Sequence, residues 1–568
     1  MTPRSASKTT KTTSLFSIDD KARIIEYFST FSRSLFFKTI KFFIELILPV
    51  YTTANDNIPV KMENLSLDIK LGLGNLTINN LNLDTLNAIV LNGDINLKNT
   101  DSKHVKISQK GNIKIDDCNL RELEINNPNG SVDINNTKFA QLDITAEKGS
   151  VSLNACDVAE DEISRIETGI GNIFINSSKF YNLIATTFDG SIDLEDVTEY
   201  EMTMISNSNG KLLVKKLNAE EVKLESCDGS VKIEESKIDK ASVTVAEGNL
   251  NLIKGTINEL EVDINNGCVN IEDLSFDWES QDIKQVKVNV EIGDIDIKKL
   301  TSCFVEASTS DGVLDAEDIE SESVQLRTAS GYLCLQRAKS DVIKLDTSEG
   351  NVEVTDIESK DLLIDVDSED ISVANVKTNT IEVHTSAGKV TVDNLEAKEV
   401  SISSEEGDSE ISKIHVDSLK INIDTLLNSA YFDDSVCQDL KIVTSVGDII
   451  GRGVTLGDID IITFPTGTEE VGIENLKAEY LNVDVVDADV SIQDSEVTEL
   501  HVDTADGSVD ISILESIFNY KTELITRYGN LIKDTEESEL PLVVLKPKNS
   551  IFVDTNNGDI KVLFKGKN

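Results

Sequence analysis

A short phrase recurs through almost the whole chain: a glycine, any residue, an aliphatic residue, any residue and a second aliphatic residue. Between Gly74 and Gly558 there are 25 copies, some with another residue in place of the glycine, and sixteen of the 24 intervals between them are 19 residues long. Clear copies are GNLTI from Gly74, GSVDI from Gly130, GDIDI from Gly293 and GNVEV from Gly350. A fixed period of this kind indicates a repeat protein, in which every repeat forms one small structural unit.

Each repeat alternates apolar and polar residues, which is the pattern of a strand with one buried face. A second alternating stretch lies seven and five residues before the next glycine, as Leu142 and Ile144 do before Gly149, and a third apolar position often follows the glycine by seven residues, as at Val197. Nineteen residues are too few for a βαβ unit but suit one turn of a β-coil, with the glycine at a tight turn. Stacked coils bury these side chains in a continuous column. We therefore predict an all-β fold, a single long β-solenoid (β-helix) of about 25 coils over residues 56–568.

The period lengthens most at two places, which we interpret as insertions near residues 272–287 and 532–550. The interval from Gly267 to Gly293 is 26 residues, and that from Gly529 to Gly558 is 29. The first insertion contains Trp278, the only tryptophan of the chain. Trp278 is a candidate contact for a protein partner on a protruding loop. The alternative is that it covers a local apolar gap.

The charge of the chain restricts its partners. The sequence has 102 acidic and 53 basic residues, a net charge of −49. Nucleic acid is excluded as a partner of such a body, because its binding requires Lys and Arg to neutralise phosphates. Disorder, the other common reading of high charge, conflicts with a hydrophobic content of 39% arranged in strict alternation.

The N-terminal 48 residues differ from the rest, with eight basic and four acidic side chains. Residues 1–18 contain no acid and predict a disordered, basic, Ser/Thr-rich tail. Asp19 and Asp20 offer an N-cap and favourable charge for a helix, no Gly or Pro follows until Pro49, and apolar and polar residues segregate on a helical wheel. We therefore predict one amphipathic α-helix over residues 19–51, ahead of the solenoid.

Three roles are open for this helix. It could lie in a membrane surface through residues 19–48, as its large apolar face and basic polar face favour. It could instead cap the first coil, as solenoids require, or serve as a mitochondrial or other organelle presequence. The candidate membrane contacts are Phe28, Phe31, Arg33, Leu35, Lys38, Lys41, Phe42, Phe43 and Leu46.

We predict no catalytic, cofactor or metal site. The four histidines lie at no metal-ligand spacing with another histidine or a cysteine, and no GxSxG, P-loop or HExxH motif occurs. Acidic residues recur at one outward position of the repeat, which could suit a solenoid enzyme or calcium but fits a solvated face better. Those acids are Asp133, Asp193, Asp296, Glu353 and Asp510.

The seven cysteines are odd in number and have no CxxC spacing, and the first 18 residues do not read as a secretory signal. Both features favour a reducing, intracellular setting. Cys118 and Cys156 fall two coils apart in the inward column, about 10 Å, which exceeds the roughly 7 Å limit for a disulfide. We expect all seven to be unpaired.

The tandem phrase, led in by L-x-I-x-T, resembles an adhesin-type β-strand repeat family of unknown function. The resemblance covers residues from about 56 to 568 and implies a β-helical fold. The residues that carry it include Leu142, Ile144, Gly149, Val151 and Leu153, and also Leu500, Val502, Thr504, Gly507, Val509 and Ile511.

From these features we predict a non-enzymatic scaffold or interaction protein, intracellular and attached to a membrane periphery by its N-terminal helix, with protein partners that the sequence does not identify. The alternative from another class is an exported, adhesin-like surface protein. A carbohydrate-active solenoid enzyme is the third.

Overall fold

The computed structural model describes residues 23–25, 44–45, 66–158, 162–277, 284–423, 429–444, 447–463, 470–535 and 547–566. Within them all regular structure is β, apart from one 3₁₀ turn at Ile517–Asn519. The chain forms two compact units, Met1–Ile238 and Asp239–Asn568.

The first unit is built of short strands followed by longer ones, and β22 (Lys237–Glu247) contains the division between the units. Its strands are β1 Arg23–Ile25, β2 Ile44–Glu45, β3 Ser66–Leu71, β4 Leu76–Asn79, β5 Asn82–Val90, β6 Ile95–Lys98, β7 Asp101–Lys110, β8 Ile113–Asp116, β9 Asn119–Asn129, β10 Val132–Asn135, β11 Lys138–Lys148, β12 Val151–Asn154, β13 Asp157–Val158, β14 Ile163–Ile170, β15 Ile173–Asn176, β16 Lys179–Asp189, β17 Ile192–Glu195, β18 Thr198–Asn209, β19 Leu212–Lys215, β20 Asn218–Asp228 and β21 Val231–Glu234.

In the second unit many of these strand pairs merge into single strands of up to 17 residues. Its strands are β23 Leu250–Asn266, β24 Val269–Ser275, β25 Gln285–Ile292, β26 Ile295–Thr301, β27 Phe304–Asp311, β28 Leu314–Ser330, β29 Leu333–Glu349, β30 Val352–Ser368, β31 Ile371–Lys377, β32 Thr380–Ala387, β33 Val390–Glu406, β34 Ser409–Ile423, β35 Ala430–Asp433, β36 Val436–Thr444, β37 Ile449–Arg452, β38 Thr455–Thr463, β39 Glu470–Glu474, β40 Lys477–Val485, β41 Asp489–Thr504, β42 Val509–Ile513, β43 Tyr520–Thr526, β44 Leu531–Thr535, β45 Asn549–Thr555 and β46 Ile560–Phe564.

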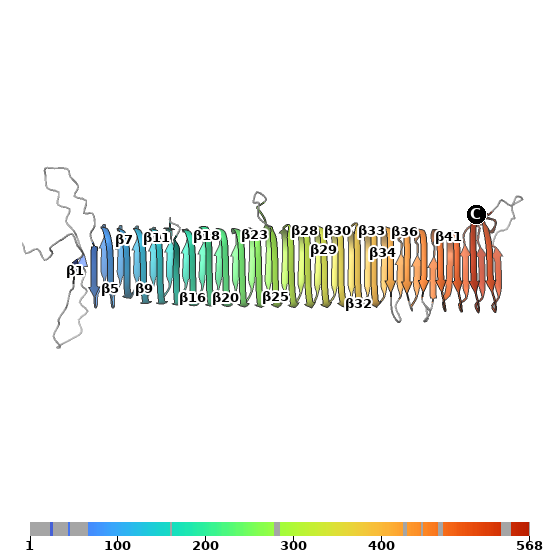
Figure 1. The fold of residues 1–568 in the computed structure, drawn as a ribbon, viewed down its shortest axis with the longest axis horizontal. Coiled ribbons are helices and arrows are strands. Elements are labelled where there is room, and N and C mark those ends of the chain that lie inside the picture. Colours follow the sequence, from blue (N-terminus) through green and yellow to red (C-terminus); the bar gives the residue numbers. More distant parts are fainter. Residues whose placement is uncertain are drawn as a thin grey trace, which may run out of the picture. The chain divides into compact units, whose positions relative to one another are not determined.

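Both units are parallel β-solenoids with a period of about 19 residues and about 22 turns in all. One coil of the first unit shows the plan: β10 runs to Asn135, β11 continues to Lys148, and the next coil begins at Gly149. Val132 pairs with Val151 of the following coil in parallel register. Within each unit neighbouring strands lie side by side in this way (Figure 1). The predicted fold class is therefore confirmed, with about 22 turns in place of the predicted 25 coils.

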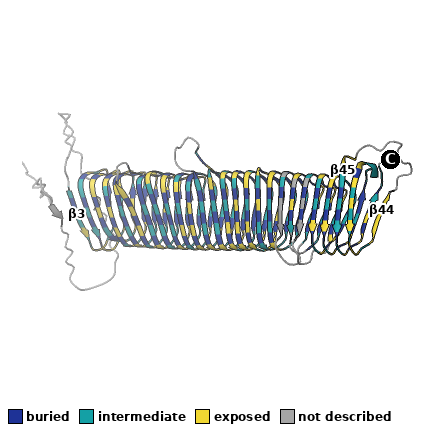
Figure 2. Ribbon diagram, turned by 45° about the vertical axis from the view of Figure 1, so that its right-hand side comes forward, coloured by how far each residue is buried: buried dark blue, intermediate teal, exposed yellow. Residues whose placement is uncertain are grey.

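The apolar column that the alternation predicts is the core. Ile115, Ile134 and Leu153 stack in successive coils and are at most 1% exposed. Burying an aliphatic side chain of this size contributes about 1.5–3 kcal/mol. Buried and more exposed residues alternate along the strands (Figure 2).

The repeat glycine occupies a corner that no other residue fits easily. Gly130 has a φ of 139°, and a Cβ there would collide with the carbonyl oxygen of Gly111 one coil away. The threonine of the L-x-I-x-T phrase supports the same corner. Thr309 donates its hydroxyl hydrogen to the carbonyl oxygen of Gly293, at 2.9 Å.

A second corner lies six residues after the glycine and was not predicted. Asn136 has a φ of 46° and Asp117, one coil earlier, a φ of 52°. The two side chains are joined, because the Asn136 amide donates to the Asp117 carboxylate at 2.7 Å. Asn and Asp tolerate this left-handed conformation better than most residues, so their frequency at this position was the available signal.

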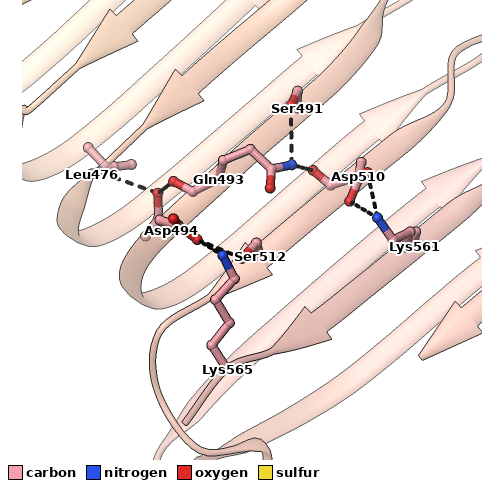
Figure 3. Close-up of polar contacts among 9 residues, drawn as sticks. Leu476, Ser491, Gln493, Asp494, Asp510, Ser512, Lys561 and Lys565 are labelled. Atoms are coloured by element: carbon pink, nitrogen blue, oxygen red, sulfur yellow. Dashed lines mark hydrogen bonds and ion pairs between the residues drawn. The ribbon is translucent and has the colours of Figure 1, made fainter. Parts of the chain in front are cut away.

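The last three coils of the second unit do not stack in chain order. Strands β45 and β46, the last in sequence, lie between the β41–β42 coil and the β43–β44 coil. Lys561 forms an ion pair with Asp510 at 2.9 Å, and Lys565 pairs with Asp494 (Figure 3). The final coil is thus held on both faces by parallel pairing.

The predicted N-terminal helix is not confirmed. Of residues 19–51 the structure describes only 23–25 and 44–45, and both are short strands. β1 pairs with β3 and β2 with β4, because the first coil has backbone groups free to pair with an added strand. The remainder of the predicted helix and the tail 1–18 lie outside the described residues.

Pairing also shows where the period lengthens. Leu260 of β23 pairs with Val286 of β25, which lies 26 residues on, and Thr522 of β43 pairs with Ile551 of β45, 29 residues on. Both longer intervals contain residues that are not described, 278–283 and 536–546.

Candidate functional site

The residues predicted to contact a membrane or a partner lie outside the described part of the chain. They are Phe28, Phe31, Arg33, Leu35, Lys38, Lys41, Phe42, Phe43, Leu46 and Trp278. Their roles stay predictions. Within the described ranges there is no helix long and apolar enough to cross a membrane.

The first unit carries an open groove of about 440 Å³ on its outer surface. Residues 145–147 of β11, 167–169 of β14 and 186–188 of β16 line it, together with Ser206 and Ser208 of β18. The strands are paired in the order β11, β14, β16, β18, so the groove crosses four successive coils. We refer to it as the Gly169 groove.

The groove exists because Gly169 interrupts a column of outward side chains. The equivalent residue is Glu147 one coil before and Phe188 one coil after, and both are exposed. A Cβ on Gly169 would lie 2.6 Å from the carbonyl oxygen of Glu147, so a larger residue would force the strands apart. Glycine therefore leaves a gap between a carboxylate and an aromatic ring.

The lining combines acid, hydroxyl and aromatic groups. Glu167 stands in the neighbouring outward column, between Thr145 and Thr186, and the Arg165 guanidinium approaches it at 3.6 Å. Phe188 is 64% exposed, which is high for a phenylalanine. No basic side chain lines the groove. Its chemistry suits a group that is both cationic and flat, or one with several hydroxyls.

The outward acids that share one repeat position are not brought together as a site. Asp133 lies between Lys114 and Ser152 in neighbouring coils, and Asp193 lies between Phe174 and Leu213. Burial raises the pKa of the Asp193 carboxyl, and the nearby Glu195 carboxylate adds to that effect. In the described ranges, no three His, Cys, Asp or Glu side chains are grouped as a metal site requires.

A carboxyl group is buried in the apolar column, and sequence reasoning missed it. Glu199 of β18 is 3% exposed and pairs with Phe180, which is fully buried. The register shifts by one residue just after this pair, as in a β-bulge, and the Glu201 amide donates to the Glu199 carboxylate at 2.7 Å. Burial raises the pKa of Glu199 to about 7. The 20-residue interval from Gly190 to Gly210 was the only sign of this irregularity.

Two cysteines lie in the inward column, as predicted. Cys118 is 3% exposed and Cys156 is 1% exposed. Burial raises the pKa of both thiols to about 11, so they behave as small apolar residues. The prediction that all seven cysteines are unpaired in the native protein remains to be tested in solution.

The stacked coils, the glycine corners and the merged strands define a β-solenoid repeat protein. A family model described as Toastrack DUF4097 matches residues 5–195, 165–279, 278–375 and 339–563. The chain belongs to this family. The resemblance drawn from the sequence is thus confirmed as a repeat domain of unknown function, whereas the adhesin description is not shown. No curated protein and no solved structure matches the chain.

Proposed function

We propose that this chain is a non-enzymatic interaction scaffold, intracellular, and held at a membrane surface by residues 19–48. The observation that carries the scaffold role is that the inward residues of successive coils stay alike while the outward residues vary. One outward position holds Lys114, Asp133, Ser152 and Phe174 in four successive coils, while the inward residues beside it remain aliphatic. Repeat proteins use this arrangement to display an extended surface that a partner can recognise.

The membrane role is supported by the charge difference within the chain. Residues 1–48 carry a surplus of four basic side chains, whereas the whole chain has a net charge of −49. Anionic lipid attracts the first and repels the rest, so the N-terminal segment is the part suited to a lipid surface. The odd number of cysteines favours a reducing compartment on the same side of that membrane.

Flotation of the full chain with vesicles tests this proposal. The full chain should float with vesicles that contain anionic lipid, and changing Arg33, Lys38 and Lys41 to Glu should weaken this strongly, since each basic side chain near such a surface contributes about 1 kcal/mol. Changing Lys339, Lys360 and Lys377 of the second unit to Glu gives the same change in net charge and should alter flotation less. An equal loss of flotation in the two triple variants, or no flotation of the full chain, would contradict the proposed membrane attachment.

A further inference from the structure

The Gly169 groove has no assigned occupant, and four features restrict what it can hold. It is open, it has an exposed aromatic wall in Phe188, it has carboxylates at Glu147 and Glu167, and no basic side chain lines it. The side chain of Glu147 has no hydrogen bond or ion pair with any other described residue. The gap at Gly169 separates this carboxylate from the exposed ring of Phe188, which lies two coils further on.

These features select a cation over an anion or a purely apolar group. A cation is drawn to the face of an aromatic ring by the ring quadrupole. It also forms charge-assisted hydrogen bonds with carboxylates. An anion would meet the carboxylate of Glu147 with no basic side chain on the lining, because Arg165 lies outside the lining and already approaches Glu167 at 3.6 Å.

Among cations, the guanidinium of arginine fits best. It is planar, so it can stack on the ring of Phe188, and its several N–H groups can reach more than one acceptor at once. Acceptors are available on both sides of the gap, at the carboxylates of Glu147 and Glu167 and at the hydroxyls of Thr186 and Ser208. A lysine ammonium would use fewer of them.

We infer that the Gly169 groove binds an arginine side chain presented by a basic segment of a partner protein. This rests on the proposed scaffold function and gives it a ligand class. The net charge of −49 draws basic segments toward the protein as a whole, and the groove supplies the specific contact. The four successive coils that it crosses leave room for residues on either side of the arginine.

The test is the affinity of the full chain for a fluorescein-labelled tetra-arginine peptide, measured by fluorescence anisotropy. At about 0.15 M salt, attraction from distant acids is largely screened, so local contacts dominate. Phe188→Ser, which copies Ser208 of the next coil, should weaken binding by about three- to fivefold through loss of the cation–π contact. Glu147→Gln combined with Glu167→Gln should weaken it by about tenfold.

Matched controls separate the groove from general charge attraction. Phe174→Ser removes another exposed aromatic ring of the same unit, and Asp365→Asn with Glu382→Gln removes two exposed carboxylates of the second unit. Each control should change the affinity by less than about twofold. All these side chains are on the surface, so circular dichroism should show every variant folded.

An equal loss in the groove variants and their controls would overturn the inference, as would unchanged binding in the groove variants. Tighter binding of a neutral oligosaccharide, maltotriose, than of the peptide would also overturn it. Vesicle flotation of the groove variants should match that of the unaltered chain, because residues 19–48 are intact. A failure of the arginine-binding proposal can therefore be distinguished from a failure of the proposed membrane attachment.

Discussion

Thr555 donates its hydroxyl hydrogen to the carbonyl oxygen of Gly507 at 3.0 Å, although 48 residues separate the two in sequence. The same contact elsewhere joins residues 16 apart, as between Thr309 and Gly293. The long separation arises because the last coil in the sequence lies beside β41 and β42, while the coil that precedes it in the chain lies beyond it. Thr526 of that outer coil donates to the carbonyl oxygen of Gly558 at 2.9 Å.

This order predicts that the outer coil depends on the end of the chain. In the described residues β43 and β44 pair only with β45 and β46. Deleting residues 547–568 should therefore release residues 520–535, and trypsin should cleave after Arg527 about tenfold faster or more, because cleavage follows local opening.

The control for this deletion keeps the coil but removes its surface ion pairs. Changing Lys561 and Lys565 to Gln should leave the cleavage rate after Arg527 nearly unchanged, since exposed ion pairs contribute about 0–1 kcal/mol. Equal cleavage of the deleted and the complete chain would contradict the stacking order.

The glycine corner predicts a large difference between two Gly→Ala substitutions in the first unit. Gly130→Ala places a Cβ against the backbone of Gly111 at a φ of 139°, and should lower stability by about 3 kcal/mol. Gly72→Ala meets no atom within 4 Å and should be nearly neutral. Hydrogen exchange around each site measures the two effects. Similar exchange in both variants would show that the corner is not tight.

Glu199 predicts a pH dependence of stability. Its pKa rises from 4.5 to about 7 on folding, so the folded state retains a proton that the unfolded state loses. Stability from this group is present below about pH 4.5 and is lost as the pH rises through 7.

Glu199→Gln removes this titration. The melting temperature of the variant minus that of the unaltered chain should therefore be larger at pH 8 than at pH 5. The free energy involved is about 3 kcal/mol. Glu221→Gln, an exposed neighbour on the next coil, should leave the pH profile unchanged. An unaltered profile in Glu199→Gln would show that Glu199 ionises normally in the folded protein.

The fold could be predicted because the repeat is a local pattern. Gly130 and Ile134 fix a corner and an inward side chain within five residues, and the same spacing returns in coil after coil. The corner at Asn136 was missed, although Asn and Asp gather at that position, because a left-handed residue is a weaker signal than a glycine.

The groove and the end of the chain could not be predicted, because both depend on which coils are neighbours. Gly169 is an ordinary residue in the sequence and becomes a gap only between Glu147 and Phe188. Gly529 and Gly558 carry similar local signals, so nothing near either one shows that Gly558 stacks directly on Gly507. Glu199 follows a repeat interval of 20 residues, and the length alone did not show which residue turns inward.

The most direct test of the stacking, on which the surface and the groove depend, is a pair of introduced cysteines one coil apart. Asp346 pairs with Asp365, and Asp365 pairs with His384, in parallel register. Neighbouring strands lie about 4.8 Å apart, within the range that a disulfide can bridge, whereas two coils span about 10 Å, which it cannot. Asp346→Cys with Asp365→Cys should therefore form a disulfide on mild oxidation, as peptide mapping would show, and Asp346→Cys with His384→Cys should not. A disulfide in the second pair and none in the first would contradict the 19-residue coil.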